Sequence, residues 1–256
     1  MFEAKGIDVS YAQGVIDWQK VKASGITQAI IRATASYPHG TASGVDKQFK
    51  PNIEGALAAG IDCGVYHYCY ALSVDEAKLE ARHFLNTIKG YKLTLPAILD
   101  FEDNTQTKLS PAVKADICDA FLQIVQSAGY YAMLYSMASW LKSDLSDARL
   151  SKYDKWVAHV GTPKPAYSGN YGIWQFSWEG KVDGITGDVD MNYVYRDYPT
   201  IIKNAGLNGW AVQDKPATPI IETVPKADYD ALQVKYDGLQ TKYNALINGM
   251  KALIGG

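Results

Sequence analysis

Short apolar runs alternate with amphipathic segments through most of this sequence, and this pattern constrains the fold more than any other feature. The runs have the length of buried strands, and the segments between the early runs have helical spacing and end at glycine stop signals. Strands and helices that alternate in this way form βα units and a parallel sheet or barrel. The predicted strands cover residues 6–10, 28–33, 63–70, 95–99, 130–135, 155–160, 172–177 and 189–194.

Helices are predicted between the early strands and mainly loops between the last ones. Ser73-Val74-Asp75-Glu76 predicts a capping box that opens one helix, and Ser110-Pro111 starts the next. The chain of 256 residues accommodates one barrel, which takes about 200 to 250 residues. We therefore expect an α/β barrel over residues 1–210 whose later crossovers have lost their helices.

A different pattern follows the predicted barrel. Residues 211–225 include Pro216, Pro219 and Pro225 and are typical of a semi-stiff linker. Residues 226–256 carry a heptad repeat, with a positions Tyr229, Tyr236, Tyr243 and Met250 and d positions Leu232, Leu239, Leu246 and Leu253. We predict a coiled-coil helix that forms a homo-oligomer, with dimer, trimer and tetramer all open. Docking of the helix on its own barrel is the alternative.

Charge and composition argue against several classes of partner. The formal net charge of -2 gives no electrostatic reason to expect nucleic acid or an anionic membrane as a partner. No run approaches the roughly 18 apolar residues of a membrane helix, and the N-terminus lacks the pattern of a signal peptide. Cys63, Cys69 and Cys118, with four histidines, show no zinc spacing. We predict free, mostly buried thiols, no metal and no cofactor.

The fourth predicted strand ends in three acids, Asp100, Glu102 and Asp103. Strand side chains alternate, so Asp100 and Glu102 point to the same side with α-carbons about 6.6 Å apart. Two carboxyls at this separation suit cleavage of a glycosidic bond, in which one protonates the leaving oxygen and the other stabilises positive charge. A structural acid pair that caps a helix or binds a cation is the alternative.

Short motifs occur in a characteristic order between about residues 5 and 200. They include Gly6-Ile7-Asp8-Val9-Ser10, Gly64-Val65-Tyr66-His67-Tyr68, Pro96-Ala97-Ile98-Leu99-Asp100-Phe101-Glu102, Trp174-Gln175-Phe176-Ser177 and Val189-Asp190-Met191-Asn192. This ordered set resembles the glycoside hydrolase family 25 lysozymes, which are N-acetylmuramidases acting on bacterial peptidoglycan. The resemblance implies an irregular TIM-like (β/α)5(β)3 barrel. It also places an acidic cluster at the C-terminal ends of the strands, formed by Asp8, Asp100, Glu102 and Asp190.

These acids have separate predicted roles. Glu102 is the general acid, because burial beside other acids raises its pKa and keeps it protonated near neutral pH. Asp100 stays ionised and orients the substrate's own N-acetyl group, whose carbonyl attacks the anomeric carbon; a direct Asp100 nucleophile is the alternative. Asp8 and Asp190 adjust the pKa values of Asp100 and Glu102 and bind hydroxyls or the acetamido group of the substrate. Asp188, two residues before Asp190, is the alternative for the last position of the acidic cluster.

Aromatic side chains near the strand ends are candidates to stack on sugar rings, with core packing as the alternative for each. They are Tyr66, Tyr68, Tyr135, Trp156 and Trp174. Gln175 is a candidate hydrogen-bonding partner of the substrate. His67 lies on the opposite strand face from Tyr66 and Tyr68, so we interpret it as a packing histidine.

The predicted function is a retaining, substrate-assisted peptidoglycan hydrolase that cuts between N-acetylmuramic acid and N-acetylglucosamine. It acts on the bacterial cell wall as a phage endolysin made in the host cytoplasm. A chitinase-like hydrolase is rejected, because its signature needs aspartates where this chain has Leu95 and Ile98. A non-catalytic, oligomeric wall-binding or virion structural protein is the other alternative; loss of an acid would mark it. One departure from the family is Ala35 and Ser36, where relatives commonly carry an acid followed by Gly.

Overall fold

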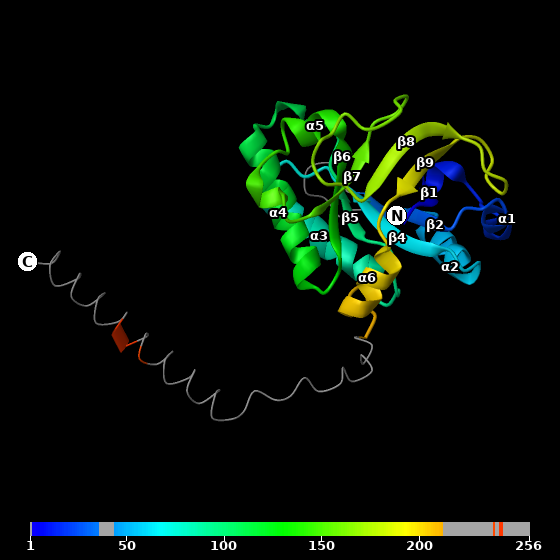
Figure 1. Cartoon of the computed structure of the whole chain (residues 1–256), viewed down its shortest axis with the longest axis horizontal. Coiled ribbons are helices and arrows are strands. Elements are labelled where there is room, and N and C mark those ends of the chain that lie inside the picture. Colours follow the sequence, from blue (N-terminus) through cyan, green and yellow to red (C-terminus); the bar gives the residue numbers. More distant parts are fainter. Residues whose placement is uncertain (1, 36–43, 212–237, 239–240, 243–256) are drawn as a thin grey trace, which may run out of the picture. The chain divides into compact units, whose positions relative to one another are not determined.

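The structure is a computed structural model that describes residues 2–35, 44–211, 238 and 241–242, and the chain divides into two compact units, Met1–Gln213 and Asp214–Gly256. The first unit is a mixed α/β barrel (Figure 1). In the second unit Gly238, Thr241 and Lys242 are helical. The linker prolines, the heptad positions and the predicted oligomer interface lie outside the described residues.

A closed barrel of mostly parallel strands forms the centre of the first unit. Its strands follow the order β1, β9, β8, β7, β6, β5, β4 and β2, and pairing between β1 and β2 closes the ring. The bounds are β1 (Ala4–Val9), β2 (Gln28–Ala35), β4 (Asp62–Tyr68), β5 (Ala97–Asp100), β6 (Ala132–Met137), β7 (Asp154–Ala158), β8 (Ile173–Gly180) and β9 (Val189–Val194). A short β3 (Gly44–Val45) pairs antiparallel with β2. All the predicted strands are confirmed.

Helices cover the outside of the early strands. They are α1 (Trp18–Ala23), α2 (Phe49–Ala58), α3 (Val74–Ile88) and α4 (Pro111–Ser127) (Figure 1). The shorter α5 (Ala138–Lys142) follows β6, and α6 (Tyr198–Ala205) follows β9. Three short 3-10 helices are η1 (Tyr11–Gln13), η2 (Asn104–Lys108) and η3 (Ala148–Leu150). The crossover from β7 to β8 is a loop, and β8 and β9 pair antiparallel. The prediction of helix-poor later crossovers is confirmed.

The predicted helix caps are mostly confirmed. Ser73 accepts a hydrogen bond from the Glu76 backbone N–H, and Ser110 caps α4 with Pro111 in the first turn. The capping box at Ser73 is incomplete, because the Glu76 carboxylate accepts from the Leu72 N–H (2.7 Å) instead of from the N-cap residue. The carboxylate therefore binds the chain one residue before the predicted partner.

Strand alternation divides the core into two clusters. Residues such as Leu99 and Leu134 point outward and pack against the helices. Residues such as Ile98 and Met133 point inward and fill the barrel. The thiols of Cys63, Cys69 and Cys118 are free and buried. Among the described residues, no helix has the length and hydropathy needed to cross a membrane.

Helix α6 was not predicted, and it closes the N-terminal end of the barrel. Its Tyr198 and Ile202 belong to the inward-facing cluster, together with Leu95. Beyond it, Asn208 adopts a left-handed backbone (φ 55°) and donates from its side-chain amide to the Leu95 carbonyl (2.8 Å). The indole N–H of Trp210 donates to the carbonyl of Leu93 (2.9 Å). These contacts place the helix and the residues after it under the barrel floor, which leaves the opposite end for a site.

Candidate active site

The four predicted acids gather at the C-terminal end of the barrel. Asp8 lies near the end of β1, Asp100 ends β5 and Glu102 follows it. Asp190 lies near the start of β9, so the prediction that it lies at the C-terminal end of a strand is wrong. Strand β9 runs antiparallel to β1 and places Asp190 directly opposite Asp8 in the ladder, which brings it to the same end of the barrel.

Two side-chain amides hold Asp8 in place. Its Oδ2 accepts hydrogen bonds from Asn192 Nδ2 (2.7 Å) and from Gln175 Nε2 (3.0 Å). Gln175 Oε1 in turn accepts from the Tyr135 hydroxyl (2.9 Å) and from the indole N–H of Trp178 (3.0 Å). The predicted residue Gln175 therefore links both sides of the site, and because its polar atoms are already engaged it acts here as a bridge between protein groups.

Burial raises the pKa values of the clustered carboxyls. Burial raises the pKa of Glu102 to about 7; the hydrogen bond with Tyr135 opposes the shift, while the charges of Asp8 and Asp103 add to it. Burial and the neighbouring Asp8 raise the pKa of Asp190 to about 8. Burial also raises the pKa of Asp8, against the hydrogen bonds from its two amide partners. The site therefore holds protons near neutral pH, as predicted for a general acid.

Asp100 is the most confined of these acids. It is 4% exposed, and its Oδ1 is a buried oxygen without a hydrogen-bond partner among the described residues. Burial and the charges of Glu102 and Asp8 raise the pKa of Asp100 well above its usual range, and Arg32 opposes the shift. Arg32 is itself bound by Asp46 through Nη2 (2.7 Å) and Nε (2.8 Å). A buried acceptor without a partner costs about 1 to 3 kcal/mol, so Oδ1 marks a place where a ligand donor belongs.

The aromatic candidates differ in their exposure to the site. Tyr135 packs against Trp156 with ring centroids 4.4 Å apart, and Tyr66 meets Trp156 edge-on at 6.2 Å. Trp156 is only 2% exposed, and its N–H donates to Asn192 (2.8 Å). It therefore forms part of the floor beneath the acids and offers no free face. Tyr68 is partly exposed, and its hydroxyl donates to Asp103 (3.1 Å).

Two sequence candidates lie away from the acids. Trp174 alternates with the inward-facing Gln175, so its ring packs on the outer face of β8 against Phe176 and Tyr193, and its N–H donates to a backbone carbonyl. The structure therefore does not bring Trp174 to the cluster. Asp188 is 55% exposed and pairs with Lys181 (2.6 Å), which removes it as a rival to Asp190.

Sequence reasoning missed three residues of the site. Asn192 shares a strand face with Asp190 at a spacing of two, and this alternation is a signal that could have found it. Arg32 lies two residues after the inward-facing Ile30 on β2, so the same alternation could have found it. Trp178 has no comparable signal, because the register of β8 against β9 shifts between Gln175 and Gly180.

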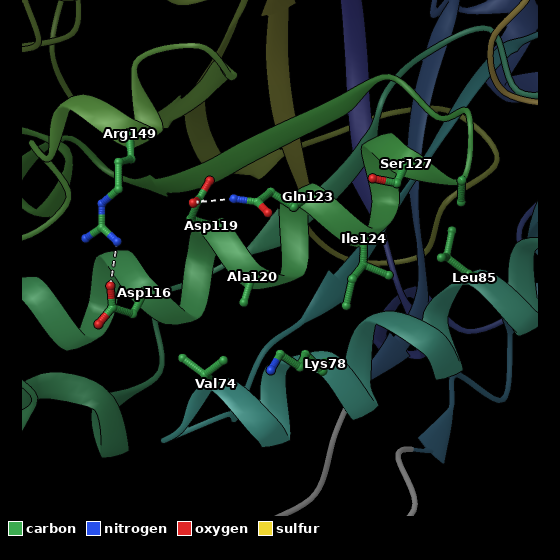
Figure 2. Close-up of a pocket in the computed structure, with 11 residues that line it drawn as sticks. Val74, Lys78, Leu85, Asp116, Asp119, Ala120, Gln123, Ile124, Ser127 and Arg149 are labelled. Carbon is green, nitrogen blue, oxygen red and sulfur yellow. Dashed lines mark hydrogen bonds and ion pairs between the residues drawn. The ribbon is translucent and has the colours of Figure 1, made fainter. Parts of the chain in front are cut away.

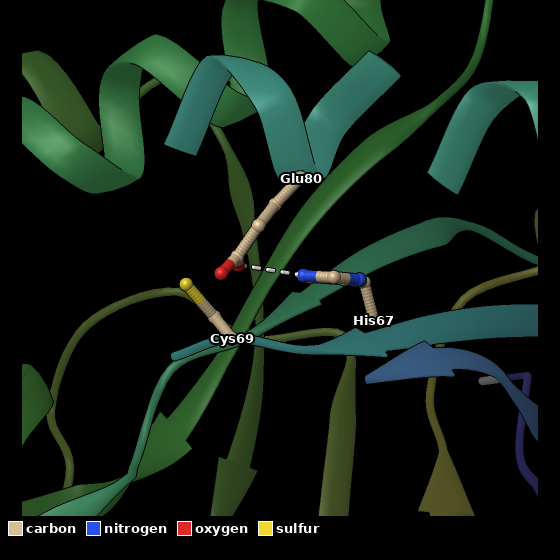
Figure 3. Close-up of side chains that lie close together, drawn as sticks. All are labelled: His67, Cys69 and Glu80. Atoms are coloured by element: carbon tan, nitrogen blue, oxygen red, sulfur yellow. Dashed lines mark hydrogen bonds and ion pairs between the residues drawn. The ribbon is translucent and has the colours of Figure 1, made fainter. Parts of the chain in front are cut away.

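A second buried cluster lies on the outer face of β4 (Figure 3). Ligand-type atoms of His67, Cys69 and Glu80 lie within 4.8 Å of one another. His67 Nε2 bonds Glu80 (2.7 Å), its Nδ1 bonds the Thr34 hydroxyl (2.7 Å), and its ring stacks on Phe121 at 5.1 Å. The interpretation of His67 as a packing histidine is confirmed. Because both ring nitrogens are engaged, the cluster is a structural hydrogen-bond network.

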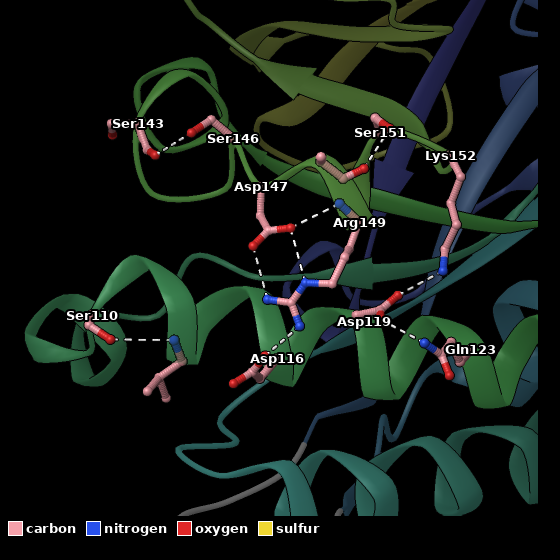
Figure 4. A network of polar contacts seen from close by, with 12 residues as sticks. Ser110, Asp116, Asp119, Gln123, Ser143, Ser146, Asp147, Arg149, Ser151 and Lys152 are labelled. Carbon is pink, nitrogen blue, oxygen red and sulfur yellow. Dashed lines mark hydrogen bonds and ion pairs between the residues drawn. The ribbon is translucent and has the colours of Figure 1, made fainter. Parts of the chain in front are cut away.

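A cavity of about 630 Å³ lies on the helical outside between α3 and α4 (Figure 2). Beside it Arg149 pairs with Asp116 (2.6 Å) and Asp147 (2.9 Å), and Asp119 with Lys152 (3.0 Å) (Figure 4). None of the four clustered acids lines this cavity. Its charged groups are paired, which is typical of a solvated surface and not of a catalytic centre.

A closed β/α barrel with buried, proton-holding acids at the C-terminal end of its strands is the arrangement of a barrel enzyme. The family model described as "Glycosyl hydrolases family 25" matches residues 7–185. The chain therefore belongs to glycosyl hydrolase family 25.

Individual relatives agree with this assignment. The chain is 30% identical over 191 residues to the autolytic lysozyme of Clostridium acetobutylicum, covering 73% of this chain and 55% of that protein. It is 31% identical over 201 residues to lysozyme M1 of Streptomyces globisporus, covering 73% and 66%. The crystal structure of a bacterial lysozyme from Streptomyces coelicolor superposes with a TM-score of 0.67 at 29% identity, covering 79% of this chain and 96% of that one. The chain thus spans about half to two thirds of the length of these two curated relatives.

Proposed function

We propose that this chain is a peptidoglycan hydrolase that cuts the glycosidic bond between N-acetylmuramic acid and N-acetylglucosamine. The observation that carries the proposal is the pairing of two unlike acids at the C-terminal end of β5. Glu102 has a pKa of about 7, while the neighbouring Asp100 presents a buried oxygen that lacks a donor. A proton donor beside an acceptor is what substrate-assisted glycoside cleavage requires.

The proposed first step uses Glu102 and Asp100 together. The Glu102 carboxyl gives its proton to the glycosidic oxygen while the acetamido carbonyl oxygen of the substrate attacks the anomeric carbon and the bond to the leaving sugar breaks. When the substrate binds, the acetamido N–H donates to Asp100 Oδ1 and lowers the pKa of Asp100, which releases its proton to solvent; the carboxylate then balances the positive ring that develops. Burial alone favours the protonated form, so the substrate completes the ionised state predicted for Asp100.

In the second step a water molecule attacks the anomeric carbon from the side that the leaving sugar vacated. Glu102, now ionised, takes a proton from this water, and the acetamido oxygen leaves the anomeric carbon. Two inversions at one carbon give net retention of configuration. The raised pKa values of Asp8 and Asp190 favour their protonated forms, which limits the negative charge around Asp100 and Glu102. Both acids also accept hydrogen bonds from Gln175 Nε2 and hold this side chain in place.

A digest of purified peptidoglycan tests the proposal. New reducing ends that are muramic acid support it, and glucosamine ends would assign the opposite bond. Binding to peptidoglycan without any release of reducing ends would favour the non-catalytic wall-binding protein instead.

The proposal extends to the whole chain. Residues 1–210 form the catalytic domain, residues 211–225 a linker, and residues 226–256 a coiled coil that joins several barrels. Joined barrels engage one wall together, which raises avidity. The proposed role is that of a phage endolysin, and it is supported by a phage lysozyme among the relatives of the chain; efficient export of this chain from intact cells without lysis would contradict this role.

A further inference from the structure

A second cavity opens at the same end of the barrel as the acids. Its volume is about 360 Å³. Met137 at the end of β6, Ala158 at the end of β7 and Trp178 on β8 form part of its wall. We call it the Trp178 pocket; its lining is completed by Ala138, Ser139, Lys142, His159, Val160 and Ala166. The strand ends that supply Tyr135 and Gln175 to the acid cluster also supply this wall.

Trp178 is unusual because it is large, apolar and 48% exposed, yet held in one orientation. Its indole N–H donates to Gln175 Oε1 (3.0 Å), the same atom that accepts from Tyr135. The same Tyr135 hydroxyl interacts with Glu102 and lowers the pKa of its carboxyl. The indole ring is therefore tied to the general acid through two buried side chains, and it stands at the border of the site.

The rest of the pocket combines apolar walls with polar groups at the edge. Met137 is 38% exposed and continues the apolar surface beside the indole. His159 Nδ1 accepts a hydrogen bond from the Ala166 backbone N–H (2.8 Å), which assigns the proton of a neutral ring to Nε2. Nε2–H, Ser139 and Lys142 are then donors around an apolar floor.

We propose that the Trp178 pocket is a glycan subsite that binds an N-acetylhexosamine unit beyond the sugar whose bond is cut. A pyranose ring has an apolar C–H face and a rim of hydroxyl and carbonyl acceptors, which matches a fixed indole surrounded by donors. The inference rests on the proposed function, because it names a further part of the same substrate. Trp178 stacks on the ring, and His159 Nε2–H donates to its acetamido carbonyl or hydroxyls.

The test uses the full-length chain and glycan oligosaccharides of increasing length, each prepared with and without stem peptides. Trp178→Ala removes the aromatic face and the N–H, whereas Trp178→Phe removes the N–H and keeps an aromatic ring. Leu79→Ala, on an exposed apolar residue of α3, is the matched control. Circular dichroism melting curves establish that each variant is folded.

We expect Trp178→Ala to raise KM about tenfold on strands long enough to reach the pocket, with a smaller effect on kcat and on shorter strands. Trp178→Phe should raise KM much less, and the pH profile should stay in place.

Three results would overturn the subsite. One is an unchanged KM at all lengths. Another is an equal loss in both Trp178 variants with a shifted pH profile, which would make Trp178 a positioning residue acting through Gln175. The third is an effect confined to peptide-bearing strands, which would assign the pocket to the stem peptide. A wild-type chain that cleaves no glycan would instead refute the proposed function itself.

Discussion

Carboxylates are buried at both ends of the barrel, but the partners that surround them differ between the two ends. At the N-terminal end, Asp154 starts β7 and is surrounded by partners: Arg196 (3.2 Å), the hydroxyl of Tyr198 and that of Tyr131. At the C-terminal end, Asp100 keeps an oxygen without a partner and has other acids as neighbours. The difference is between a carboxylate whose partners all come from the fold and one that leaves an oxygen for a ligand, as expected of the catalytic acid that we propose.

The same contrast extends to the charged partners at the two ends. Asp154 pairs with Arg196 and accepts a hydrogen bond from the Tyr198 hydroxyl. At the C-terminal end, Arg32 gives two hydrogen bonds to Asp46, and its charge only partly offsets the effect of burial on the pKa of Asp100. The cluster therefore retains protons, as a general acid requires. We expect substitutions in the cluster to lower activity with little effect on stability, and substitutions at the N-terminal end to lower stability with little effect on activity.

The largest effect is expected from Glu102→Gln. The amide keeps the shape of the side chain but cannot donate a proton, so turnover on peptidoglycan should fall about 10³- to 10⁴-fold with the melting temperature nearly unchanged. Release of reducing ends measures it, and Glu54→Gln on the exposed surface of α2 is the matched control. Activity within a few-fold of wild type would remove Glu102 from its role.

Asp100→Asn should reduce the rate about 10²- to 10³-fold, because the amide cannot carry the negative charge that the positive ring requires. Kinetics on the same substrate measure the loss. Mass spectrometry of the quenched wild-type enzyme provides the decisive check: a sugar covalently attached to Asp100 would replace the substrate-assisted mechanism by direct attack.

The pH dependence of kcat/KM tests the protonation of the acid cluster, and we expect several-fold changes. Since the Glu102 pKa is about 7 and its protonated form is active, kcat/KM should fall as the pH rises through about 7. Tyr135→Phe removes a hydrogen bond that lowers the Glu102 pKa, so the alkaline limb should move to higher pH. A limb that stays in place or moves to lower pH would show that Tyr135 does not stabilise the ionised carboxylate.

Asp154→Asn should affect stability and not chemistry. The change removes the charge that Arg196 faces, and we expect a loss of about 1 to 3 kcal/mol in the free energy of unfolding, measured by urea titration. The kcat should remain close to wild type. A large loss of kcat in a folded Asp154→Asn protein would break the distinction between the two ends.

The smallest effect on catalysis is expected from removal of the second unit. A chain that ends at residue 211 should cleave soluble glycan at the wild-type rate, because both ends of the barrel are retained, and light scattering should show that it is a monomer. The full chain should be an oligomer at micromolar concentration. A monomeric full chain would refute the coiled coil, and an oligomeric short chain would move the interface to the barrel.

Local patterns in the sequence determined much of this protein. A run such as residues 95–99 has the apolar character of a buried strand on its own, and Ser110-Pro111 starts α4 through contacts within one turn. The four acids were found because each belongs to a short motif. Strand periodicity predicted that Asp100 and Glu102 point to one side, and the two carboxyls do interact although β5 ends at Asp100.

Other features depended on contacts between distant segments, which only the tertiary structure decided. Asp190 lies in the cluster because β9 runs antiparallel to β1. Trp174 lies outside the cluster because the neighbouring Gln175 occupies the inward-facing position on β8. Helix α6 is stabilised by the barrel interior, and Trp178 is oriented by Gln175. Periodicity assigns a side chain to one of two faces, but strand direction and register select which face meets the site, and these arise from pairing across the whole chain.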